Sequence, residues 1–147
     1  MNEENGQEVK LFSEIVSDAI KERFLTYLEA SEVSGVTVSA ISRFMRGERT
    51  LRLDSIEKLW PHLGLSVKPA EIDEIIRTKG FDAALRTLIE TLGQNELQFA
   101  NKAGMNQSTL WRYIHKGGSM KLPNMELILA ATPVKFYRGS KRVDLVD

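Results

Sequence analysis

The feature that most constrains the fold is an internal repeat with an offset of 69 residues. Gly35 and Arg43 recur as Gly104 and Arg112 in this register. Apolar residues also match apolar residues at the paired positions 20/89, 28/97, 41/110, 53/122 and 67/136. Several matches in one register exceed what chance supplies, so a duplicated unit is predicted, with copies near 10–68 and 80–138.

Each copy is predicted to contain four helices. In the first helix, Ile15, Val16 and Ile20 recur at the spacing that places apolar residues on one helical face. The helices expected in the first copy are 13–24, 27–34, one from Val38 to Gly47, and 53–63. Those expected in the second copy are 82–92, 95–103, one from Gln107 to Gly117, and 123–131.

The remaining segments suggest short strands and a linker. Residues 65–68 and 134–138 alternate between apolar and polar side chains as strands do, and Gly139-Ser140 suggests a terminal hairpin. The expected organisation is a first unit at 10–68, a linker helix at 69–80, a second unit at 81–132 and a C-terminal strand or hairpin at 133–147. The expected fold class is all-α, with a short C-terminal β-hairpin in addition to the helices.

The second and third helices of each copy are joined by a short turn with a defined chemistry. Gly35 and Gly104 can adopt the left-handed conformation that closes a helix. Thr37 and Asn106, two residues later, have side chains that accept hydrogen bonds from the free amides of the next helix. This order predicts two helix-turn-helix units.

The third helices have unusual outward faces. Ile41, Phe44 and Met45 are expected to point inward in the first copy, as Leu110, Tyr113 and Ile114 do in the second. The outward faces carry small polar and basic side chains and no carboxylate. The chain has zero net charge, yet residues 33–52 and 101–131 each carry four basic residues and one acidic residue. Such local positive charge matters more for phosphate binding than the global sum.

On these residues, the sequence resembles the Cro/C1 (Xre-type) helix-turn-helix family of bacterial and phage repressors. The second copy is the closer match, through the run from Leu97 to Leu110 with its Gln-Ser-Thr opening at 107–109. The first copy matches through 35–37, 41–44 and 47–49, but it departs from the family at Val38 and Ala40, where polar base-reading groups are usual. The resemblance implies two tandem lambda-repressor-like units that insert one recognition helix each into the major groove of DNA.

The expected DNA-binding residues follow from these two helices. Arg can clasp guanine and Gln can clasp adenine, so Arg43, Arg112 and Gln107 are candidates for reading bases. Arginines and lysines beyond the helix starts are candidates for phosphate contacts. The full expected set is Thr37, Val38, Ser39, Ala40, Ser42, Arg43, Arg46, Arg49, Asn106, Gln107, Ser108, Thr109, Trp111, Arg112 and Lys116.

The sequence contains few residues or motifs that would support catalysis or metal binding. The absence of cysteine excludes a disulfide framework, a thiolate zinc site and a cysteine nucleophile. There is no GxxxxGK[ST] phosphate loop and no recognisable nucleophile context, so the chain is not expected to be an enzyme. His62 and His115 stand alone, so neither a metal nor a cofactor is expected. Trp60 and Phe99 are expected in the core, and Asp54, Glu57, Asp73 and Glu74 on solvated helix faces.

A DNA-binding transcriptional regulator, most simply a repressor or autorepressor, is therefore the leading interpretation. One alternative is an antitoxin or accessory protein that binds DNA and also a protein partner, through the acidic N-terminus or the C-terminal hairpin. Another is an interaction protein that has kept the fold without binding DNA, which Val38 and Ala40 favour. The expected partners are double-stranded DNA and a second copy of the chain, with no membrane. The expected location is the cytoplasm, because no apolar run approaches the roughly 20 residues of a membrane span.

Overall fold

The computed structural model describes residues 8–91, 95–118 and 120–145. The chain is mostly helical within these ranges. Its first part contains β1 (Glu8–Lys10), α1 (Phe12–Arg23), α2 (Tyr27–Ser34), α3 (Val38–Met45), α4 (Leu53–Leu59), the 3-10 turn η2 (Trp60–His62) and β2 (Leu65–Lys68). There follow α5 (Ala70–Lys79), α6 (Phe81–Thr91), α7 (Glu96–Ala103), α8 (Gln107–Lys116), α9 (Leu122–Ala130), β3 (Lys135–Arg138) and β4 (Lys141–Leu145).

The repeat found in the sequence is also present in the helices. The pairs α1 and α6, α2 and α7, α3 and α8, and α4 and α9 each begin 69 residues apart. The predicted helices are confirmed, with ends that agree to within a few residues. The largest difference is at α4, which ends at Leu59 and continues as a 3-10 turn that contains Pro61. Proline lacks the amide that a continuing α-helix needs there.

Residues at equivalent positions of the repeat meet in the middle of the molecule. Phe12 opens α1 and Phe81 opens α6; their ring centroids are 5.7 Å apart in an edge-to-face contact. Both rings are buried in a single hydrophobic cluster, which they share with Trp60 and Phe136. Together with the four helix pairs of the repeat, this contact indicates an approximate twofold axis that relates the two copies. We call this line the pseudo-twofold axis of the chain.

Two glutamates at equivalent positions of the repeat make similar contacts between the two units. The Glu57 carboxylate on α4 accepts a hydrogen bond from the Phe81 amide of α6 at 2.6 Å. Its equivalent Glu126 on α9 accepts one from the Ser13 amide of α1 at 3.3 Å. Each unit therefore caps the first helix of the other, where anionic groups are favourable. Glu57 is half-buried, which corrects the expectation of a solvated face. Burial raises its pKa, although the Phe81 hydrogen bond acts in the opposite direction.

The strands form one sheet, so the hairpin expected beside the helices is part of a larger strand structure in a mostly helical chain. The strand order is β1-β4-β3-β2, with β1 parallel to β4 and the other pairs antiparallel. Val67 pairs with Phe136, and Phe136 with Val143, so that buried side chains line one face of three strands. A two-stranded hairpin is only marginally stable alone. The C-terminal hairpin is therefore completed by strands from the start and the middle of the chain.

The segment predicted as a linker is an integral part of the structure. Helix α5 contacts both α6 and β2, and its Ile72 and Ile76 are buried. It also covers the open edge of β2: the Val67 amide donates to Asp73 at 3.1 Å, and Arg77 donates to the Leu65 carbonyl at 2.7 Å. Asp73 is thus not a solvated face residue, because it satisfies an edge strand that would otherwise be unpaired.

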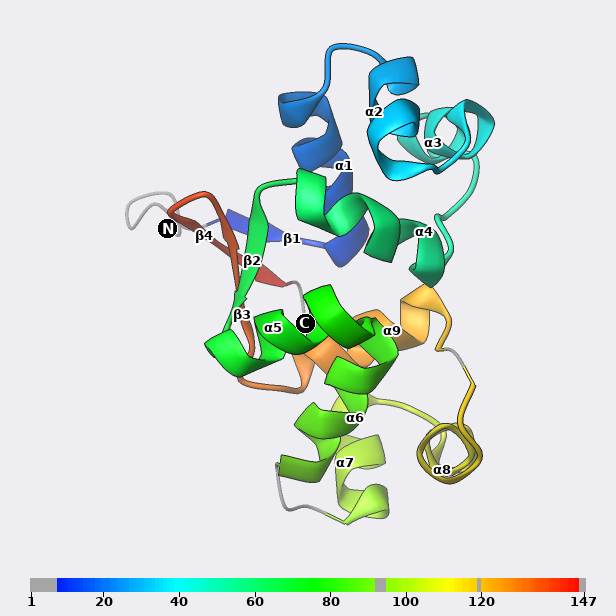
Figure 1. Cartoon of the computed structure of the whole chain (residues 1–147). Helices are drawn as coiled ribbons and strands as arrows, with labels where there is room; N and C mark the ends of the chain where they lie inside the picture. Colours follow the sequence, from blue (N-terminus) through cyan, green and yellow to red (C-terminus); the bar gives the residue numbers. More distant parts are fainter. Residues whose placement is uncertain (1–7, 92–94, 119, 146–147) are drawn as a thin grey trace.

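Figure 1 shows the first unit above, the second unit below, and the sheet at the left. Helices α3 and α8 both lie at the right-hand edge of this view, on the side opposite the sheet. In the part of the chain that the structure describes, no helix combines the length and the apolar character that a membrane crossing requires.

Candidate functional site

The turns before α3 and α8 have the predicted chemistry. Gly35 closes α2 with φ 81°, and Gly104 closes α7 with φ 75°, a left-handed conformation that glycine adopts readily. The Thr37 hydroxyl accepts a hydrogen bond from the Ala40 amide at 3.1 Å. Asn106 accepts one from the Ser108 amide at 2.8 Å. Thr37 and Asn106 therefore hold the helix starts, which fixes the direction of each third helix.

Helix α3 buries its predicted inward stripe and exposes most of the other side. Ile41 and Phe44 are buried and Met45 is half-buried. Ala40 departs from the expectation, because it is half-buried and packs against the core. It lies four residues before Phe44 and therefore on the same face of the helix. Ser42 is also half-buried, and the exposed members of the expected set are Thr37, Val38, Ser39, Arg43, Arg46 and Arg49.

Helix α8 presents a hollow on its outward face. Its volume is about 380 Å³, and it is lined by Gln107, Ser108, Trp111 and Arg112. The Trp111 side chain is 43% exposed. It contacts residues of its own helix: the ring centroids of Trp111 and His115 are 4.8 Å apart. The remaining expected residues of this unit, Asn106 and Lys116, are exposed, whereas Thr109 is half-buried.

The third helices contain no carboxylate, but one carboxylate lies near the end of each: Glu48 is a local neighbour of α3, and Glu96 reaches α8 from α7. Glu48 lies 2.9 Å from Arg46, and Glu96 of α7 lies 2.5 Å from the His115 ring nitrogen. The helices themselves carry no carboxylate, as expected. In the described part of the chain, Arg43 and Arg112 form no salt bridge. Both guanidinium groups are exposed to solvent.

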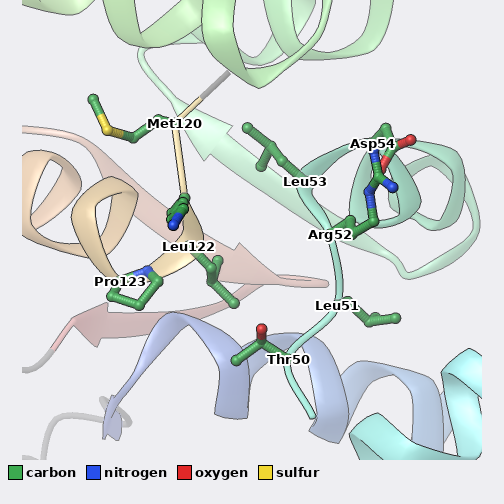
Figure 2. A pocket seen from close by; sticks show the side chains of 9 residues that line it. Thr50, Leu51, Arg52, Leu53, Asp54, Met120, Leu122 and Pro123 are labelled. Atoms are coloured by element: carbon green, nitrogen blue, oxygen red, sulfur yellow. The ribbon is translucent and has the colours of Figure 1, made fainter. Parts of the chain in front are cut away.

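A larger pocket lies between the two units. Its volume is about 560 Å³, and Figure 2 shows the segments that face each other across it, 50–54 and 120–123. Leu51 and Met120 are equivalent in the repeat, as are Arg52 and Lys121. The pocket therefore lies on the pseudo-twofold axis, between the starts of α4 and α9. Arg52 and Lys121 are exposed and supply positive charge there, although Asp54 lies 3.4 Å from Arg52.

A polar network in the second unit was not expected from the sequence. The Tyr113 hydroxyl donates to Asp82 at 2.5 Å, and Asp82 also accepts from the Met120 amide at 3.2 Å. Arg86 donates to the carbonyls of Tyr113 and Gly118 at 3.3 and 2.6 Å. Burial raises the pKa of Tyr113, and the Asp82 hydrogen bond acts in the same direction. The network fixes the segment after α8 against α6.

Of the two segments expected to bind a protein partner, the structure describes only the C-terminal hairpin. The acidic residues 1–7 lie outside the described residues. The C-terminal hairpin is not a free appendage, because β3 pairs with β2 and β4 pairs with β1. Its inward side chains Phe136 and Val143 are buried in the core.

Comparison with protein families, with curated proteins and with solved structures gives no match to this chain. What the protein does must therefore be inferred from its own residues.

Proposed function

We propose that this protein is a sequence-specific double-stranded DNA-binding regulator, most simply a repressor or autorepressor. Helices α3 and α8 act as recognition helices, each in a major groove, within two tandem helix-turn-helix units. The order of helix, left-handed glycine, capping side chain and second helix supports this in both units. The resemblance to Cro/C1 repressors, strongest at 97–110, agrees with it.

The observation that carries the proposal is the pseudo-twofold relation between two exposed, basic helices. Dimeric repressors read two half-sites about 34 Å apart because a twofold axis relates their recognition helices. Here the axis that passes through the contact of Phe12 with Phe81 lies within one chain. One shared core holds both units, so their recognition helices keep a fixed spacing. The first contact with DNA then makes the second favourable through a high effective concentration.

The proposed DNA-binding residues fall into two groups, those suited to bases and those suited to phosphates. Gln107 and Arg112 line the hollow on α8 with Ser108, and their side chains have the chemistry to read base edges. Lys116 follows at the end of the same helix and is suited to a phosphate. Arg52 and Lys121, near the pseudo-twofold axis, face the centre of the bound site. Because the two recognition helices differ in sequence, the preferred DNA site should be asymmetric.

Selection of bound duplexes from a random DNA pool tests the proposal. The selected duplex should bind at least about a thousandfold more tightly than a shuffled one at the same salt concentration. The double variant Gln107→Ala/Arg112→Ala should lose most of this preference. Lys135→Ala, on β3 at the opposite side of the molecule, is the matched control and should retain it. Equal affinity for selected and shuffled duplexes, or no binding to either, would exclude the proposed function.

A further inference from the structure

The first unit contains a basic hollow beside α3. It has a volume of about 250 Å³ and lies between the start of α3 and the segment before α4. Three guanidinium groups and several small hydroxyl groups surround it. The polar residues that matter are Thr37, Ser39, Arg43, Arg49, Arg52 and Ser55.

The positive charge of this hollow is largely uncompensated. Neither Arg43 nor Arg49 forms a salt bridge within the residues that the structure describes. Arg52 lies 3.4 Å from Asp54, but its side chain is 85% exposed. Exposed pairs of this kind contribute little and exchange readily for another anion. The lining of the hollow therefore holds three positive charges and no carboxylate, with Asp54 beside Arg52.

Three arginines around a concave surface suit a phosphate group better than the edge of a base. A guanidinium group donates two parallel hydrogen bonds to a phosphate, and hydroxyl groups supply further donors. Ala40 and the buried Leu51 complete the lining with apolar surface. No amide side chain lines the hollow, so the pairing of Asn or Gln with adenine is not available there.

The equivalent positions in the second unit carry one positive charge fewer, because Arg43 corresponds to Arg112 but Arg49 has no charged equivalent. Arg49 corresponds to Gly118, which carries no charge, and Arg52 corresponds to Lys121. The hollow on α8 includes Ser108 and Arg112, the equivalents of Ser39 and Arg43, but Gln107 and Trp111 complete its lining. An amide, an aromatic ring and one guanidinium group suit the recognition of bases rather than of a phosphate.

We propose that the hollow beside α3 binds one backbone phosphate of the DNA, and that the first unit anchors the protein while the second reads the sequence. This inference rests on the proposed function. It assigns Arg43 and Arg49 to a contact that every duplex offers. It also explains how Val38, which cannot donate or accept a hydrogen bond through its side chain, can stand at the start of a DNA-facing helix.

The decisive variant is Arg49→Gln, which removes one charge from an exposed segment outside the helices. It should weaken binding to selected and shuffled duplexes by the same factor, about tenfold at low salt, and reduce the salt slope by about one. Single methylphosphonate substitutions along the duplex then locate the contact. Neutralising one phosphate in the weakly specified half of the DNA site should lower the affinity of the wild type by the same factor. It should not lower the affinity of the Arg49→Gln variant any further. Lys135→Gln serves as the charge-matched control and should leave both measurements unchanged.

Each outcome has a separate meaning. If Arg49→Gln relaxes the preference at a base pair, the hollow reads sequence and the phosphate assignment is wrong. If Arg49→Gln binds like the wild type, the hollow does not contact DNA, while the proposed function stands. If inorganic phosphate alone saturates the hollow below millimolar concentration, seen as shifts of the Ser39 amide, its ligand is a free phosphate compound instead. If the wild type binds no duplex, both proposals are overturned together.

Discussion

The two units follow the same path but differ in what holds the segment after the third helix. In the second unit, Arg86 and Asp82 tie this segment to α6 through Tyr113 and Met120. The first unit has serines at the positions equivalent to Asp82 and Arg86, and Phe44 in place of Tyr113. A hollow of about 490 Å³, lined in part by Ser13, Ser17 and Phe44, takes the place of the network.

This difference matches the roles proposed for the two units. Reading a base requires a side chain to be held within a fraction of an ångström, which a second layer of hydrogen bonds provides. Contact with a phosphate tolerates more movement, because electrostatic attraction depends weakly on direction. The unit with the polar recognition helix is also the unit whose following segment is fixed. The two copies thus share one order of helices but differ in the side chains around the third helix.

The largest change in the free energy of unfolding is expected in the core that the two units share. Phe81→Ala removes a buried ring from the pseudo-twofold axis and should lower the free energy of unfolding by about 3–5 kcal/mol. Because both units share one core, the loss should appear in a single urea transition followed by circular dichroism and by tryptophan fluorescence. Leu97→Ala, at a half-exposed position on α7, is the control and should have a small effect. Two separate transitions would mean that the units fold independently.

The second prediction compares equivalent arginines. Arg112→Ala should cost about 1–3 kcal/mol of specific binding and relax the preference at one base pair. Arg43→Ala should weaken binding to selected and shuffled duplexes alike, because the contact proposed for Arg43 is to a backbone phosphate. Competition with single-base variants of the selected duplex measures both effects. Uniform weakening by Arg112→Ala would remove its base-reading role and with it the contrast between the units.

The polar network offers a smaller test. Tyr113→Phe makes the second unit resemble the first and deletes one hydrogen bond to Asp82, at an expected cost of about 1 kcal/mol in unfolding free energy. Amide exchange at Met120 should also become faster. The reverse change, Phe44→Tyr, should bring no gain, since Ser13 stands where Asp82 stands in the second unit. An equal effect of both changes would show that the network does not distinguish the units.

The reciprocal caps predict a pH dependence. Burial raises the pKa of Glu57 in the folded state. Its carboxyl therefore stabilises the fold below its ordinary pKa, and this contribution is lost as the pH rises through the raised folded-state pKa. Glu57→Gln keeps an oxygen for the Phe81 amide, so it should change stability by less than about 1 kcal/mol at neutral pH. As the pH rises through the folded-state pKa of Glu57, the wild type should lose unfolding free energy that the Glu57→Gln variant keeps, as measured by urea titrations. A difference in unfolding free energy that stays constant with pH would contradict the raised pKa of Glu57.

The smallest effect is expected at the exposed start of α3. Val38→Gln gives the first unit the residue found at Gln107 and should change stability by less than about 0.5 kcal/mol. It should strengthen the base preference of the weak half-site in a repeated selection. Ala40→Thr should be less well tolerated, because Ala40 packs against the core. A marked loss of melting temperature with Val38→Gln would place this side chain in the interior.

The sequence by itself determined the local structure of this protein. The starts of the third helices at Val38 and Gln107, the closing glycines and the capping side chains were all predicted and are confirmed. The same holds for the 69-residue offset and for the strand at 65–68. These features depend on residues within one or two turns of each other, so neighbouring side chains carry enough information to specify them.

Only the tertiary structure decided how these parts meet. An apolar face shows that it must be buried, but it does not specify what covers it; nothing local indicated that Phe12 would meet Phe81 or that the hairpin would pair with β2. The match of Glu57 with Glu126 was visible in the sequence, yet their exchange of capping partners requires the pseudo-twofold axis. Contacts between residues far apart in the chain depend on the global arrangement, because loop closure and packing of the whole core select them together.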